Sequence, residues 1–173
     1  LSALILVGVG VAAGPMALAG SASSGADGPS VSITHFGAPM SGPLGIVLGP
    51  DGALWFTNNG NGSIGRITTG GEFSSYRNAS ISSPWGITLG PDGALWFTSR
   101  GTNSIERITT GGKISSYRGA SIRNPEGIVL GPDGALWFTN SGNDSIGRIT
   151  TAGKISTYRG SGISFPRGIA LGR

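Results

Sequence analysis

Residues 84–98 read PWGITLGPDGALWFT, and this stretch decides the fold. Its two apolar runs, GITL and ALWFT, lie on either side of the sequence GPDG. In such a turn, Pro presets one backbone angle and Gly adopts a positive φ. The second run is rich in residues that favour extended backbone. The stretch therefore predicts two short strands joined by a tight turn.

The same stretch recurs through most of the chain. Trp55, Trp96 and Trp137 are 41 residues apart, and the prolines at 43, 84, 125 and 166 share that spacing. Three full units follow, at residues 43–83, 84–124 and 125–165, and a fourth begins at Pro166. Each unit continues from ALWFT into two further short segments of strand character, of which SIERIT (104–109) and KISSYR (113–118) are examples.

About 40 residues with four strands is the repeat of a β-propeller blade. Leu95, Trp96 and Phe97 are apolar at consecutive positions, which fits a sheet packed on both faces better than one with a wet face. No segment after residue 30 has the apolar period of a helix. We therefore predict an all-β propeller of four-stranded blades, covering residues 31–173.

Composition supports this fold and excludes several kinds of site. The chain has 33 Gly among 173 residues, which disfavours helices. The absence of Cys excludes disulfides, Cys-ligated zinc and a thiol nucleophile, and the single His excludes a site with two imidazoles from this chain. The net charge is +4, but the arginines recur at the repeat spacing instead of clustering. They indicate repeated surface arginines and no nucleic-acid partner.

The first 26 residues carry no charge and differ from the repeats. An apolar run of 13 residues precedes Ala17-Leu18-Ala19, which is typical of a secretory signal peptide and its cleavage site. The run is too short to span a membrane; a retained anchor and a buried core segment are the alternatives. We predict a signal peptide at 1–19, truncated at its start, a flexible linker at 20–30, and a secreted or extracytoplasmic protein without a membrane partner after cleavage.

The two ends of the repeat region are incomplete as blades. Residues 32–36 align with the last strand of a blade, and residues 166–173 with the first. Only three full blades lie between them, whereas propellers have 4–8. We expect the chain to be a fragment of a larger, seven-bladed propeller.

The string P-x-G-I-x-L-G-P-D-G-A-L-W-F-T, followed by S-I-G-R-I-T-T, resembles the virginiamycin B lyase family, also called streptogramin lyases. The resemblance covers about residues 43–173. It implies a seven-bladed propeller that opens cyclic depsipeptide antibiotics of the streptogramin B type by C–O elimination, without water. It also implies magnesium, a catalytic His acting as base, and glutamates near the channel mouth.

These family residues do not transfer to this chain. Blades of the family often read L-W-F-T-E, but the three copies here end in Asn58, Ser99 and Asn140. The single His, His35, lies on the predicted outermost strand. No catalytic or metal-binding residue is therefore assigned, and the chain alone is expected not to linearise a streptogramin. The alternative is a non-catalytic extracellular propeller that binds peptide, glycan or protein.

A ligand site is expected on one end of the blades. The loops after ALWFT vary among the three copies, whereas GPDG and the TTGG-type turns at the other end hardly vary. Side chains that differ at equivalent positions can build an asymmetric pocket. The candidate ligand-binding residues are Trp85, Glu126, Arg167, Asn58, Ser99, Arg100 and Asn140.

Each of these candidates also has an interpretation without ligand binding. For Glu126, Arg167 and Trp85, solvated rim residues are the favoured interpretation over a ligand site, and Glu106, which replaces a Gly of the other units, is assigned to the surface. The repeated Asp of PDG is a turn former instead of a metal ligand. The repeated Trp is predicted to be core between blades instead of a sugar-stacking platform.

Overall fold

The computed structural model describes residues 4–6, 34–36 and 40–172. The chain divides into two compact units, 1–38 and 39–173. In the first unit, β1 (Leu4–Leu6) pairs antiparallel with β2 (Thr34–Phe36). The predicted signal peptide and linker fall outside the described residues apart from β1, and they stay predictions. The second unit contains the repeats.

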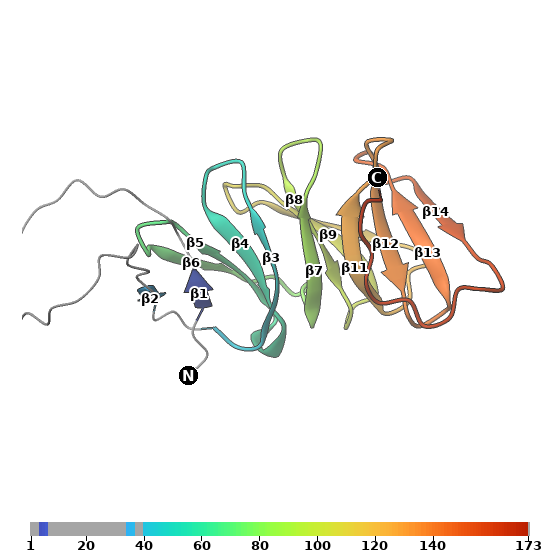
Figure 1. Cartoon of the computed structure of the whole chain (residues 1–173), viewed down its shortest axis with the longest axis horizontal. Coiled ribbons are helices and arrows are strands. Elements are labelled where there is room, and N and C mark those ends of the chain that lie inside the picture. Colours follow the sequence, from blue (N-terminus) through green and yellow to red (C-terminus); the bar gives the residue numbers. More distant parts are fainter. Residues whose placement is uncertain (1–3, 7–33, 37–39, 173) are drawn as a thin grey trace, which may run out of the picture. The chain divides into compact units, whose positions relative to one another are not determined.

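The second unit consists of three four-stranded sheets, each an antiparallel meander in chain order (Figure 1). The prediction of four-stranded propeller blades is confirmed. The first blade comprises β3 (Pro43–Leu48), β4 (Leu54–Asn58), β5 (Ser63–Ile67) and β6 (Phe73–Tyr76). The second comprises β7 (Pro84–Leu89), β8 (Leu95–Ser99), β9 (Ser104–Ile108) and β10 (Ile114–Arg118). The third comprises β11 (Pro125–Leu130), β12 (Leu136–Asn140), β13 (Ser145–Ile149) and β14 (Ile155–Tyr158).

The first strand of each blade begins earlier than the sequence predicts. It starts at the repeated Pro and contains a bulge before the repeated Ile, as between Pro84 and Ile87. The bulge places an extra residue in the strand. Because Gly86 has no side chain, the bulged strand can lie close to the next blade. A Cβ on Gly86 would lie 2.6 Å from the carbonyl oxygen of Glu126. One short 3₁₀ turn, η1 (Asn59–Asn61), also departs from the prediction of no helix after residue 30.

Two apolar clusters form the core between neighbouring sheets. Trp55 and Phe97 lie in the cluster between the first and second blades, and Trp96 and Phe138 lie in the one between the second and third. Trp55 and Trp96 are completely buried. The predicted burial of the repeated Trp is therefore confirmed for these two, whereas Trp137 is only partly buried.

Each repeated Trp is held by the repeated Asp of the GPDG turn. In the second blade, Trp96 Nε1 donates to Asp92 Oδ1 at 3.0 Å, and Arg107 Nε donates to Asp92 Oδ2 at 2.6 Å. Tyr117 stacks on the Trp96 ring with a centroid distance of 5.0 Å. Gly90 is required here, because a Cβ at this position would collide with the Trp96 ring. The Asp is thus more than the turn former that the sequence predicted.

The Thr of ALWFT connects neighbouring blades. Thr98 Oγ1 accepts from the backbone N–H of Gly86 at 3.0 Å and donates to the carbonyl of Glu126, in the next blade, at 2.6 Å. Thr57 and Thr139 make the same pair of bonds in their blades. One hydroxyl per blade therefore holds a bulge to the segment that begins the following unit.

Residues 166–172 continue this pattern beyond the third blade. The backbone N–H of Gly127 donates to the carbonyl of Arg167 at 2.9 Å, although residues 166–172 form no strand of their own. A hollow of about 200 Å³ lies between Trp137 and residues 169–172. Within the described residues, no helix is long and apolar enough to span a membrane.

Candidate functional site

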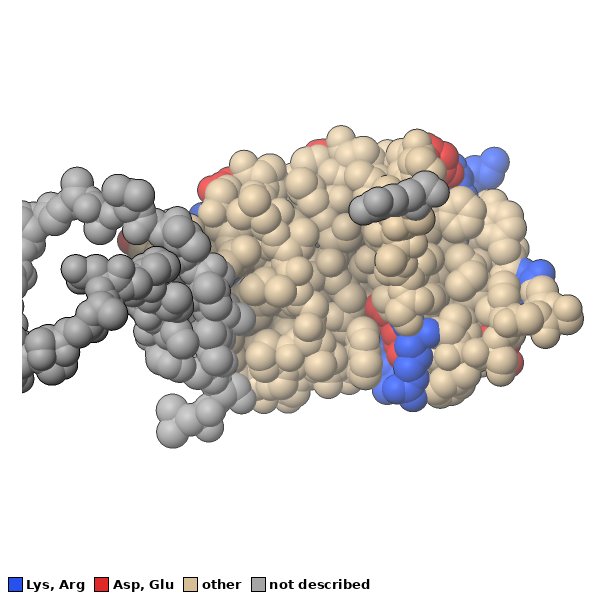
Figure 2. Space-filling view, viewed as in Figure 1, with Lys and Arg blue, Asp and Glu red and all other residues tan. Residues whose placement is uncertain are grey.

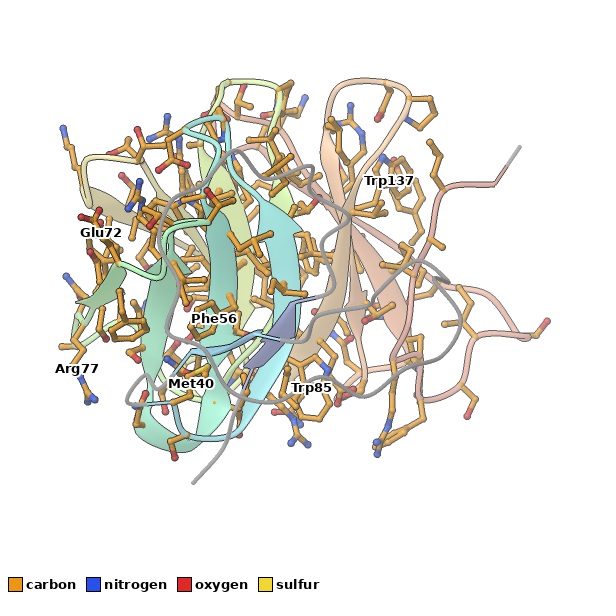
Figure 3. The ribbon with its side chains drawn as sticks, turned by 60° about the vertical axis from the view of Figure 1, so that its left-hand side comes forward. Met40, Phe56, Glu72, Arg77, Trp85 and Trp137 are labelled. Atoms are coloured by element: carbon orange, nitrogen blue, oxygen red, sulfur yellow. The ribbon has the colours of Figure 1, made fainter. Side chains whose placement is uncertain are left out.

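The candidate site lies at the end of the blades where the varied loops are. In each blade, the loop after the second strand is bonded to the connection that precedes the first strand, as in the bond from Gly101 N to the carbonyl of Ser82 at 2.9 Å. The loop after the second strand and the connection before the first strand therefore lie at the same end of each blade. Figure 3 shows Trp85 at this lower end and Trp137 toward the upper one.

Glu126 is the buried centre of the site. Its position in the bulge of β11 leaves the side chain only 1% exposed. Ser141 Oγ donates to Glu126 Oε1 at 2.9 Å. Its Oε2 atom is buried and has no hydrogen-bond partner. The solvated-rim interpretation of this residue is therefore wrong, because loops from two blades close over its carboxylate.

Two arginines flank the Glu126 carboxylate without hydrogen-bonding to it. Arg100 Nε lies 3.6 Å from Oε1, and Arg167 Nε lies 3.8 Å from Oε2. Arg100 comes from the loop of the second blade, whereas Arg167 comes from the segment that follows the third. Their side chains are 38% and 60% exposed, so both guanidinium groups reach solvent. Figure 2 shows acidic and basic side chains in contact at the lower edge.

An aromatic ring accompanies each arginine. The Arg100 guanidinium lies 5.7 Å from the centre of the Trp85 ring, and that of Arg167 lies 4.8 Å from the centre of the Phe165 ring. Both distances are within the range of cation–π attraction. Phe165 adopts a φ of +46°, which is strained for a bulky residue. Asp144 Oδ1 holds this backbone by accepting from the Phe165 N–H at 2.7 Å.

The structure thus brings together four of the seven predicted ligand residues: Trp85, Arg100, Glu126 and Arg167. Ser141 and Phe165 also belong to the site, although neither was predicted from the sequence. Ser141 is the first residue of a varied loop, and Phe165 precedes a repeated Pro. Both positions differ among the three units, so a comparison of the units could have identified them.

The other three candidates, Asn58, Ser99 and Asn140, are completely buried and bond to their own loops. Ser99 Oγ accepts from the N–H of Ser82 at 2.9 Å, and Asn140 Oδ1 accepts from the N–H of Arg123 at 3.1 Å. Asn58 Oδ1 has no partner. Ser99 and Asn140 therefore tie the two segments of the variable end together, whereas Asn58 Nδ2 donates to Ser63 Oγ within its own blade at 3.3 Å.

Glu106 is a second buried carboxyl, and its assignment to the surface is wrong. It is completely buried against the preceding blade. The hydroxyls of Ser80, Ser104 and Ser116 donate to it at 2.9, 2.7 and 2.7 Å. Burial raises the pKa of Glu106, although these hydrogen bonds and the charge of Arg118 act in the opposite direction. The Gly at this position in the other blades gave no sign of such an environment.

The described residues do not fit a magnesium site. No three His, Cys, Asp or Glu side chains among them come close enough to hold a metal ion. Glu126, the carboxylate of the candidate site, stands between two guanidinium groups, which repel a cation. The magnesium that the resemblance implies would need ligands from elsewhere in the complete protein.

The part of the chain that contains the repeats is similar in sequence to known proteins. The sequence model of the virginiamycin B lyase family matches residues 19–173. A virginiamycin B lyase from Saccharopolyspora erythraea is 54% identical over 39 residues, which are 22% of this chain and 13% of that protein.

Solved structures extend this similarity to the fold. The virginiamycin B lyase of Staphylococcus aureus is 39% identical with a TM-score of 0.76, over 80% of this chain and 49% of that one. A catalytically inactive His-to-Ala variant of the same lyase, solved with quinupristin, gives the same values. A streptogramin B lyase is 41% identical with a TM-score of 0.75, over 80% and 48%. The chain spans about half the length of these solved lyases.

Proposed function

Because the chain belongs to the virginiamycin B lyase family, we propose that the protein takes part in opening cyclic depsipeptides of the streptogramin B type by C–O elimination. The observation that carries this proposal is the match to solved lyases along the whole repeat region. The quinupristin in one of those structures names the class of ligand. In this proposal, the end of the blades that holds Trp85 and Glu126 faces the cyclic peptide.

The reaction makes particular demands on a site. A base removes the proton from the carbon next to a carbonyl, the electron pair forms a C=C bond, and the ester C–O bond breaks toward oxygen. The leaving oxygen becomes a carboxylate, and no water is consumed. A base must lie within about 3 Å of that proton in a productive pose. Guanidinium groups such as those of Arg100 and Arg167 suit the developing carboxylate.

Neither buried carboxyl is placed to act as that base. Glu126 lies between Arg100 and Arg167 at 3.6 and 3.8 Å, and Glu106 is enclosed between two blades. His35, the single His, lies outside the part of the chain whose side chains are described. We therefore assign substrate binding to these three blades and leave the base, with the magnesium, to other blades of a complete propeller.

The rival function is a non-catalytic propeller that binds a peptide, glycan or protein at the same end. One observation favours it: where blades of the family often carry Glu after L-W-F-T, this chain has Asn58, Ser99 and Asn140, which are completely buried. Both functions would use Arg100, Arg167 and Trp85 for binding. Only a measurement of turnover distinguishes the two functions.

The decisive assay measures binding and turnover separately. We expect the purified chain to bind quinupristin saturably, with a change in tryptophan fluorescence. With magnesium it is expected to form no linear product. Product and substrate have equal mass, because elimination adds no water, so chromatography and fragment spectra must separate them.

A longer form that carries the remaining family blades is expected to open the ring. Binding without turnover by that longer form would support the rival function. Turnover by the chain alone, abolished by Glu126→Gln but not by His35→Ala, would contradict our assignment of the base.

We also propose that the protein is exported and that residues 1–19 are removed. The support is the uncharged apolar run followed by Ala17-Leu18-Ala19. Amino-terminal sequencing of secreted protein is expected to begin at Gly20 or shortly after it. An intact leader on cytosolic protein would contradict this proposal.

A further inference from the structure

We propose that Arg100 and Arg167, held on either side of Glu126, bind the carboxylate of a ligand that also carries a flat apolar group. The site would take a monoanion such as the end of a linear peptide or an aryl acid. The inference concerns binding by this chain and does not depend on lyase activity.

Arg100 and Arg167 differ from the other arginines of the blades in their hydrogen bonding. Arg66, Arg107 and Arg148 each donate from Nε to an Asp at 2.6–2.7 Å. In contrast, Arg100 Nε is buried without a hydrogen-bond partner. Among the described residues, the Arg167 side chain makes no hydrogen bond, and its Nε lies 3.8 Å from Glu126 Oε2. Buried donors are normally paired, so an unpaired one beside an exposed guanidinium points to a missing acceptor.

The net charge of Arg100, Arg167 and Glu126 favours a ligand with one negative charge. Two guanidinium groups surround one carboxylate, which leaves one positive charge in excess. A monoanion cancels that excess, whereas a dianion such as phosphate would bring additional negative charge close to Glu126. The fork of a guanidinium also matches the two oxygens of a carboxylate. The charge and the geometry therefore favour a carboxylate over a phosphate.

Trp85 and Phe165 provide apolar surface beside the two arginines. Trp85 lies beside Arg100 and Phe165 beside Arg167, so each guanidinium has an apolar surface next to it. Phe165 is 53% exposed. The equivalent residues Gly42, Ser83 and Asn124 also have a positive φ, so this backbone conformation belongs to the repeat, and only the large apolar side chain is particular to Phe165. These rings suit a flat apolar group attached to the carboxylate.

The proposal has a consequence for the proposed function. Ring opening converts a neutral ester into a carboxylate, so the linear product carries the group that this site recognises and the cyclic substrate does not. If the lyase activity is correct, the arginine pair binds the leaving group and holds the product.

The test uses phenylacetate and its uncharged analogue phenylacetamide. We expect calorimetric titration of the intact chain to show binding of phenylacetate at least 10-fold tighter than that of phenylacetamide. Arg167→Gln is expected to weaken phenylacetate binding at least 10-fold. Because Arg167 is largely exposed, this variant is expected to fold as the wild type does. Arg159→Gln, at another exposed arginine, is the matched control and is expected to change nothing.

A second variant tests the aromatic wall. Trp85→Leu is expected to weaken phenylacetate more than acetate, since only phenylacetate carries a ring. Equal binding of acid and amide would overturn the proposal, and so would phenylacetate binding that survives Arg167→Gln. Binding that is lost in Glu126→Gln but not in Arg167→Gln would also overturn it, because Glu126 would then accept a bond from a ligand donor. Failure of the lyase assay would leave all of these outcomes unchanged.

Discussion

Trp96 is expected to contribute strongly to the stability of the described blades. It is completely buried, stacks on Tyr117 and donates to Asp92. We expect Trp96→Ala to lower the free energy of unfolding by about 3–5 kcal/mol, as for other buried large aromatics. Trp137→Ala is expected to cost less, since Trp137 is only partly buried. Urea unfolding of both variants measures the difference, and equal midpoints for Trp96→Ala and wild type would contradict the packing described above.

Glu106 makes stability depend on pH. Burial raises its pKa above the ordinary 4.5, so the folded protein binds its proton more tightly than the unfolded chain does. The contribution of Glu106 is then fully favourable below pH 4.5 and declines as the pH rises through its folded pKa. We expect the stability of wild type relative to Glu106→Gln to fall as the pH rises above 4.5.

The measurement is the urea midpoint of wild type and Glu106→Gln across that pH range. Glu72→Gln removes an exposed carboxylate and is the charge-matched control. A constant difference between wild type and Glu106→Gln at all pH values would show that the buried carboxyl does not titrate there.

The first strands of the blades depend on the threonine link. Thr98 joins the bulge of β7 to β11 through Gly86 and the carbonyl of Glu126. Thr98→Val keeps the shape of the side chain and removes both bonds. Each polar group left without a partner is expected to cost about 1–3 kcal/mol. The same change is expected to weaken phenylacetate binding, since Thr98 positions the strand that carries Glu126.

Thr88→Val is the matched control for this change. The equivalent residues of the other blades are already Val47 and Val129, so we expect little effect on stability or binding. Both variants are compared by urea unfolding and by calorimetric titration. If Thr98→Val proves as stable as Thr88→Val, the threonine does not link the blades.

The repeat predicted the strands well because the strands and turns of each blade depend on residues of that blade alone. It predicted the site only in part, because that site is made by residues from different blades. Glu126 looked solvent-exposed in its own segment, and Arg100, 26 residues earlier, helps to cover it. The hydroxyl of Ser80, also 26 residues away, donates to Glu106. Such contacts depend on how one sheet packs on the next, and the sequence of a single unit does not contain them.

The three Asp–Trp–Arg clusters act together on the acid stability of the molecule. Hydrogen bonds from Trp137 and Arg148 lower the pKa of Asp133 to about 2. Partial burial raises the pKa of Asp51 and Asp92, but hydrogen bonds from the Trp and Arg of their own blades outweigh it, so both lie below 3.8. Stability from a carboxyl with a lowered pKa is present above its unfolded value and is lost as the pH falls through the folded one.

We therefore expect the free energy of unfolding to decrease as the pH falls from about 4 to 2. The decrease is measured by urea midpoints, and tryptophan fluorescence is a suitable signal because each cluster contains a Trp. Asp92→Asn removes one carboxylate and is expected to make the decrease smaller. It is also expected to cost stability at pH 7, since an amide nitrogen facing Arg107 cannot accept the bond that Asp92 Oδ2 accepts at 2.6 Å. A midpoint that stays constant down to pH 2, or an Asp92→Asn variant as stable as wild type at pH 7, would show that the Asp serves only the turn.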